Sequence, residues 1–113
     1  MAGENMNSIL LSVKKHLGSD EYFNPDLIDH INTVFSKLTQ IGIGPKEGFA
    51  IEDETTEWDE FTEDLPTLNM VKTYMYLQVK MYFDVNTLSS YVIELMKVQC
   101  AELESRLNSE CDF

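Results

Sequence analysis

The segment that most constrains the fold is "PTLNMVKTYMYLQVKMYF", residues 66–83, because its apolar side chains cover much more than one helical face. At about 100° per residue, the apolar side chains span an arc of about 200°: Leu68, Met70, Val71, Tyr74, Met75, Leu77, Val79, Met81 and Tyr82. A surface helix needs an apolar stripe only somewhat wider than about 100°. The sequence therefore predicts a helix over residues 66–83 that either runs through the centre of the domain or meets another protein.

Two earlier segments also have helical spacing and predict helices over residues 6–17 and 25–41. After the first segment, Gly18 can take the left-handed conformation that ends a helix. In the second, Asn24 is a good N-cap, Pro25 suits the first helical position, and Gly42 ends the pattern. The second helix is expected to bury one broad stripe, formed by Leu27, Ile28, Ile31, Val34, Phe35, Leu38 and Ile41.

A fourth helix is predicted over residues 89–108. Its buried face is expected to be Val92, Leu95, Met96, Cys100, Leu103 and Leu107. Tyr91 and Val98 fall outside that face and are available for a second contact. Taken together, the four segments predict an all-α domain resembling a small four-helix bundle.

Residues 42–65 interrupt the helical pattern and are predicted to form an extended loop or arm. The run "GIGPKEG" is rich in residues that break helices and favour turns. Phe49, Ala50 and Ile51 alternate like a short strand, although the chain offers hardly any partner strand. Trp58 and Phe61 are three residues apart, which predicts one helical turn with the neighbouring carboxylates facing water.

Composition limits the possible classes of function. One domain is expected over residues 1–113, since a chain of this length buries a single core. With 8 basic against 20 acidic residues, a net charge of -12, the chain is a poor ligand for nucleic acid or an anionic membrane. We find no signal peptide and no apolar run that would cross a bilayer. Cys100 and Cys111 make no disulfide framework, so a reducing cytoplasm is expected.

No catalytic, cofactor or metal site is predicted. His16 and His30 fall in separate helices without a nucleophile motif. A calcium loop starting at Asp53 would place Trp58 at its sixth position, where glycine is needed. Two other classes of function stay open: an acidic regulatory protein that mimics DNA, and a small Mg-dependent helical hydrolase built on carboxylates such as Glu57 and Glu60.

The order and spacing of these segments resemble the small head–tail connector proteins (head-completion, gp6-like) of long-tailed bacteriophages. The resemblance covers residues 7–108 and is strongest in "INTVFSKLTQIGIGP", "TTEWDEF", "VKTYMYLQVKMYFD" and the closing "ELESRLN". One departure is "FDVNTLSS", where the family pattern has Pro after the Asp, so the resemblance does not specify the exact shape of the turn between the last two helices.

The resemblance implies a structural virion protein that forms a ring, commonly dodecameric, beneath the portal in the neck of the phage. Such rings extend the DNA channel, help to retain the packaged genome and dock the next neck, stopper or tail-completion protein. They assemble in the bacterial cytoplasm, and DNA passes through them without sequence-specific binding. The implied partners are further copies of the chain, the portal and a neck protein, with no membrane contact.

Two sets of residues are candidates for these contacts. Candidate residues of the subunit or neck interface are Phe49, Ile51, Trp58, Phe61, Tyr74, Met75, Tyr76, Tyr82 and Tyr91. Candidate acids facing the lumen or solvent are Glu52, Asp53, Glu54, Glu57, Asp59 and Glu60.

Overall fold

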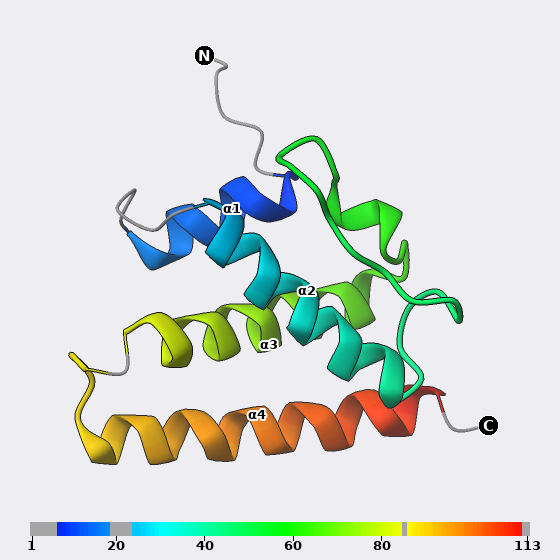
Figure 1. The fold of residues 1–113 in the computed structure, drawn as a ribbon. Helices are drawn as coiled ribbons and strands as arrows, with labels where there is room; N and C mark the ends of the chain where they lie inside the picture. Colours follow the sequence, from blue (N-terminus) through cyan, green and yellow to red (C-terminus); the bar gives the residue numbers. More distant parts are fainter. Residues whose placement is uncertain (1–6, 19–23, 85, 112–113) are drawn as a thin grey trace.

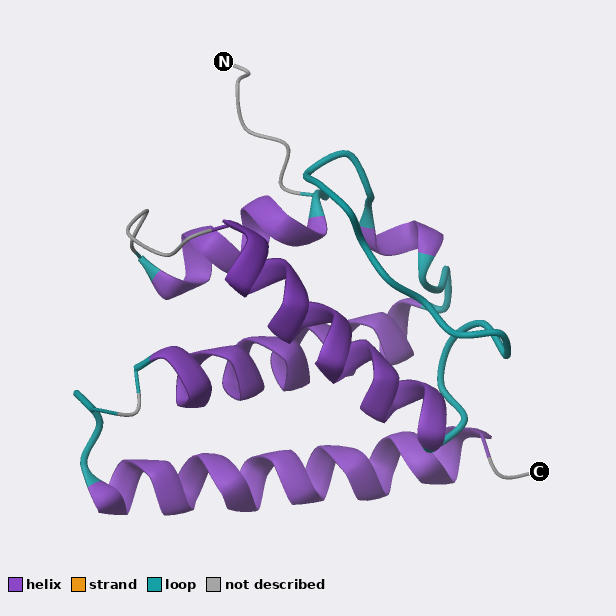
Figure 2. Cartoon of the chain, viewed as in Figure 1, coloured by secondary structure: helices purple, strands orange, loops and turns teal. Residues whose placement is uncertain are grey.

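Four α-helices and one short 3-10 turn make up the part of the chain described by the computed structural model, residues 7–18, 24–84 and 86–111 (Figure 1). The helices are α1 (Ile9–Leu17), α2 (Asn24–Gln40), α3 (Leu65–Phe83) and α4 (Ser90–Cys111), and the turn η1 is Trp58–Glu60. Within these ranges no strand is present (Figure 2). The predicted all-α fold is therefore confirmed.

α3 is the central helix of the fold. It contacts α1 and α2 on one side and α4 on the other (Figure 1). Val71, Tyr74, Met75 and Val79 are completely buried in this position. The wide apolar arc of α3 is thus covered largely by three helices of the same chain, which is the first of the two alternatives that the sequence left open. Tyr82, near the end of α3, is the exception, with 62% of its surface exposed.

The helix ends follow local rules of capping. Ser8 accepts a hydrogen bond from the Leu11 N–H, so α1 begins at Ile9. The start predicted from the sequence, residue 6, lies outside the described residues. Gly18 ends α1 in the left-handed conformation, with φ 77°, as the sequence predicts. Asp64 caps α3 by accepting from the Thr67 N–H, and a proline follows in the first turn.

The arm over residues 42–65 packs along α1 and α2 of its own chain. Its extended piece has a side-chain partner in place of a strand: the Asn32 amide donates to the Ile51 carbonyl (3.0 Å) and accepts from the Ile51 N–H (2.8 Å). Further along, Ser8 and Glu57 form an isolated antiparallel bridge. These bonds satisfy backbone groups that a buried loop would otherwise leave unpaired.

The helical turn predicted around Trp58 is confirmed as η1, and its aromatic side chains enter the core. Trp58 is completely buried, and its indole N–H donates to the Ser12 hydroxyl over 2.9 Å. The Phe61 ring packs on Phe35, with 4.9 Å between centroids, and lies over Gly44. Because a Cβ at Gly44 would lie 2.4 Å from this ring, a glycine is needed there.

α4 buries a narrower face than the sequence predicts. Met96, Cys100 and Leu107 are buried as expected, but Leu95 is 47% exposed and Val92 is 37% exposed. The prediction for these last two side chains is wrong. Leu95 precedes Met96 by one residue, about 100° around the helix, so it cannot face α3 when Met96 does.

Candidate interaction surfaces

The first candidate surface is a stripe on the N-terminal half of α4, formed by Tyr91, Leu95 and Val98. We call it the α4 apolar face. The spacing of four and then three residues places the three side chains on one side of the helix. Tyr91 is 74%, Leu95 47% and Val98 65% exposed, so the described residues leave much of each side chain open to solvent. Large apolar residues that line up on a surface are typical of protein–protein contacts.

The α4 apolar face is also electrically neutral. Residues 90–99 contain one acid and one base, Glu94 and Lys97, so their formal charge sums to zero (+1 − 1), whereas the whole chain has a net charge of -12. Glu94 and Lys97 lie 3.6 Å apart as an exposed ion pair. A second acidic subunit therefore meets less electrostatic repulsion at this face than over the chain on average.

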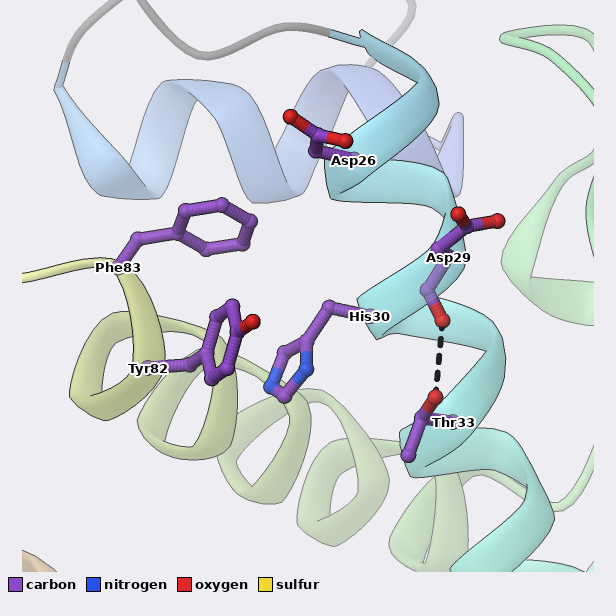
Figure 3. A pocket seen from close by; sticks show the side chains of 6 residues that line it. All are labelled: Asp26, Asp29, His30, Thr33, Tyr82 and Phe83. Carbon is purple, nitrogen blue, oxygen red and sulfur yellow. Dashed lines mark hydrogen bonds between the residues drawn. The ribbon is translucent and has the colours of Figure 1, made fainter.

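The second candidate surface is a pocket between the first half of α2 and the end of α3 (Figure 3). Asp26, Asp29, His30, Thr33, Tyr82 and Phe83 line it, and we call it the α2–α3 pocket. The Tyr82 ring stacks on the His30 ring, with centroids 4.2 Å apart and planes 16° from parallel. Phe83 meets both rings edge to face. This aromatic cluster builds one wall of the pocket and holds Tyr82 in place.

Two acidic residues of α2 also line the α2–α3 pocket; the Asp26 carboxylate lies on the side of α2 that carries His30, whereas the Asp29 carboxylate points away from the aromatic rings (Figure 3). Asp26 and Asp29 are three residues apart on α2 and both are exposed. Neither carboxylate makes a hydrogen bond or ion pair with the described residues, since Thr33 bonds the Asp29 backbone carbonyl. Burial lowers the pKa of His30 below its ordinary value of 6.5, against an opposing hydrogen bond with the Gln78 backbone, and Lys37 lowers it further. The imidazole is therefore neutral at pH 7.

The candidate acids of the arm lie on the surface. Glu52, Asp53, Glu54, Asp59 and Glu60 are exposed, whereas Glu57 is half-buried. Glu57 accepts from the Asn7 amide over 3.1 Å and takes part in a capping box with Glu60. Hydrogen bonds from Thr55 hold the pKa of Asp53 below its usual range. These carboxylates make an acidic surface along the arm.

The described residues show no arrangement typical of a catalytic or metal site. His16 stacks on Tyr76 with centroids 4.2 Å apart, whereas His30 stacks on Tyr82 at another place on α3. Among the residues in ranges 7–18, 24–84 and 86–111, no three or more His, Cys, Asp or Glu residues come together to hold a metal ion. None of the helices described is long and apolar enough to cross a membrane.

A family model described as "Phage connector protein" matches residues 9–113, which include all four helices. The chain belongs to the phage connector protein family. No curated protein and no solved structure matches it. The family match confirms the resemblance drawn from the sequence and gives the chain a structural role as a component of the phage virion. Proteins of this family are typically not enzymes.

Most of the candidate interface residues named from the sequence lie inside the connector. The fold buries five of the nine, namely Ile51, Trp58, Phe61, Tyr74 and Met75. Phe49 and Tyr76 are half-buried against the core. Tyr82 and Tyr91 are exposed, and they lie in the α2–α3 pocket and on the α4 apolar face, respectively. These two residues are therefore the members of the set that are exposed in the folded connector.

Sequence reasoning missed three residues of these connector surfaces. Asp26 and Asp29 looked like ordinary acids in the first turns of a helix, where the helix dipole favours negative charge. Nothing local indicated that these residues and the end of α3 would line one pocket. Leu95 was assigned to the core, although its register with Tyr91 and Val98, four and three residues away, was a usable signal of a second face.

Proposed function

We propose that this connector assembles into a dodecameric ring beneath the portal, where it extends the DNA channel, helps to retain the packaged genome and docks the next neck protein. The observation that carries the proposal is the α4 apolar face, an exposed and neutral stripe on a strongly acidic chain whose core is already complete without it.

The α4 apolar face supplies one half of a subunit contact. Subunits of a ring meet head to tail, so each offers two different surfaces, and the ring closes when the rotation between neighbours is right. In the proposed ring, Tyr91, Leu95 and Val98 pack against a different surface of the adjacent subunit. Burying three partly exposed large side chains contributes about 1 kcal/mol or more each, depending on the area covered.

The acidic surface of the arm supports a place beside DNA. Glu52, Asp53, Glu54, Asp59 and Glu60 are exposed in the folded chain, and no basic residue lies between Glu47 and Lys72. Carboxylates that line a channel repel DNA phosphates, so the genome slides past them without binding. In the proposed ring the arm faces the lumen or the adjoining neck protein.

The proposal is tested by introducing a charge on the α4 apolar face. A phage that lacks this gene is complemented with Leu95→Asp, which leaves the core of the subunit intact because Leu95 is exposed. We expect particles that fill with DNA, then leak it and lack tails, and necks without the ring in electron microscopy. The purified variant should keep the far-UV circular dichroism of the wild type.

A matched control is Ala101→Asp, which adds the same charge to an exposed position of α4. Ala101 lies about 90° around the helix from the α4 apolar face. We expect this variant to give infectious phage. Normal infectivity of the Leu95→Asp variant would contradict the proposed contact.

A further inference from the structure

We infer that a pocket between α1 and α3 binds a carboxylate from an acidic segment of a partner protein. Ser12, Lys15, His16, Lys72 and Tyr76 line it, and we call it the α1–α3 pocket. Assigning the partner to an adjoining neck protein rests on the proposed function, whereas binding of a carboxylate rests on the pocket alone.

The two helices that form the α1–α3 pocket are the basic part of an acidic chain. α1 and α3 together contain four lysines and no acid, a formal charge of +4, whereas the rest of the sequence has 4 bases and 20 acids, a charge of -16. Among the described residues that line the pocket, none is acidic. At an ionic strength of about 0.1 M, charges more than about 10 Å apart are largely screened. A group that enters the pocket therefore responds to the nearby lysines more than to the net charge of the chain.

Contacts with aromatic rings hold two side chains of the α1–α3 pocket in place. The His16 ring stacks on the Tyr76 ring, with centroids 4.2 Å apart and planes 13° from parallel. The Lys72 ammonium lies over the Trp58 indole, 5.8 Å from the ring centroid, and the Lys72 side chain is half-buried. Side chains that are already ordered lose less conformational entropy when a ligand binds. The pocket is thus partly organised before any partner arrives.

The polar groups of the α1–α3 pocket suit an acceptor with a negative charge. The Ser12 hydroxyl is used within the chain, because it accepts from the Trp58 indole over 2.9 Å and donates to the Ile9 carbonyl over 3.1 Å. The ammonium groups of Lys15 and Lys72 donate hydrogen bonds and cannot accept them. A carboxylate accepts from such donors in short, charge-assisted hydrogen bonds.

Duplex DNA fits the α1–α3 pocket less well than a protein carboxylate. DNA binding requires basic side chains that neutralise several phosphates along a stiff duplex. The acidic surface of the arm begins next to the pocket, since the Trp58 indole beneath Lys72 belongs to η1, where Asp59 and Glu60 are exposed. These acids repel the neighbouring phosphates of a duplex. A flexible acidic segment of a protein can place one carboxylate on the lysines without approaching them.

The test is an NMR titration of the isotope-labelled full chain with N-acetyl-hexaglutamate amide at low ionic strength, followed at the two histidines. Burial and the charge of Lys80 lower the pKa of His16 below its ordinary value of 6.5. A carboxylate in the pocket should raise this pKa, because a nearby negative charge favours the imidazolium form. The pKa of His30, which lines the α2–α3 pocket, should stay unchanged. We expect a dissociation constant on the order of 1 mM. No rise at His16, or an equal rise at both histidines, would overturn the inference.

Two double variants separate the α1–α3 pocket from general attraction to basic side chains. Lys15→Gln with Lys72→Gln should weaken hexaglutamate binding about fivefold or more. Lys46→Gln with Lys97→Gln removes two exposed lysines outside the pocket and should leave the affinity unchanged. Amide spectra that match the wild type away from the pocket show that each variant is folded. Equal weakening by the two pairs would overturn the assignment to the pocket.

Two further measurements test the class of partner. A short DNA duplex should raise the pKa of His16 less than hexaglutamate does at the same concentration of negative charge. A larger rise with the duplex would overturn the assignment to a protein carboxylate. Diluting the chain alone should leave the amide shifts around the pocket unchanged. Shifts there that depend on the concentration of the chain would overturn the assignment to a neck protein, because a second copy would then be the partner.

The assignment to a neck partner is also tested in the phage. Complementation with Lys15→Gln and Lys72→Gln together should give rings that form but fail to hold the adjoining neck protein. Fully infectious phage would overturn the partner assignment. Failure of the proposed function has a different signature, because the Leu95→Asp variant would then also give infectious particles.

Discussion

Replacing Trp58 by alanine should destabilise the single subunit, because the indole belongs to its core. The side chain is completely buried and meets Phe35 and Tyr76 at centroid distances of 6.3 and 6.2 Å. Truncating a buried Trp to Ala costs about 3–5 kcal/mol, which includes the cavity left behind. The change also removes the indole donor that bonds the Ser12 hydroxyl, a contact worth about 1 kcal/mol. Domains have about 5–15 kcal/mol of stability in total.

The measurement is urea unfolding followed by far-UV circular dichroism, which does not depend on the tryptophan being present. Trp58→Phe separates the two contributions, since a phenyl ring fills much of the space but cannot donate to Ser12. We expect this variant to lose about 1–2 kcal/mol. Tyr91→Ala is the control, because Tyr91 is 74% exposed, and the free energy of unfolding should change by less than about 0.5 kcal/mol.

A loss of less than about 1 kcal/mol in Trp58→Ala would refute the reasoning. That result, combined with failure of the variant to assemble, would mean that Trp58 anchors the arm on a neighbouring subunit. A variant that is strongly destabilised supports the packing seen in the structure, where the arm is held by its own helices.

Three further changes test other parts of the fold. Gly44→Ala should lower the free energy of unfolding, measured by thermal or urea unfolding, by about 1–3 kcal/mol, because the new Cβ would lie 2.4 Å from the Phe61 ring. Gly48→Ala is the control, since Gly48 also has a positive φ but lies in open space, and this variant should lose less. Equal losses in the two variants would contradict the close contact at Gly44. Asn32→Ala should lower the free energy of unfolding by about 2 kcal/mol, since it removes both hydrogen bonds to the Ile51 backbone. An unchanged urea midpoint would refute the role of Asn32 in holding the arm. Burial lowers the pKa of His16 and His30 below the ordinary value of 6.5, so these side chains bind protons more readily in the unfolded chain than in the folded one. The free energy of unfolding should therefore fall as the pH drops through about 6.5. The fall should be smaller in His30→Gln, and stability that is flat between about pH 7 and 5 would contradict the assignment.

The local features of this protein were readable in the sequence. Gly18 ends α1 in the left-handed conformation, α2 begins at Asn24, one residue before the predicted start, and Trp58 begins a single helical turn. Each of these depends on residues within one or two turns of the chain, where capping, glycine conformation and apolar spacing decide the outcome. The all-α fold and the membership in a connector family follow from the same patterns.

The tertiary structure decided which surfaces are covered. The wide arc of α3 was compatible with a central helix or a partner, and burial of Tyr74 by neighbouring helices makes it central. Asn32 replaces the missing strand beside Ile51, nineteen residues away, and Tyr82 joins Asp26 in one pocket. These contacts join segments far apart in the chain, so no local pattern specifies them. Periodicity tells which side of a helix is apolar, but only the packing of the whole domain determines what lies against it.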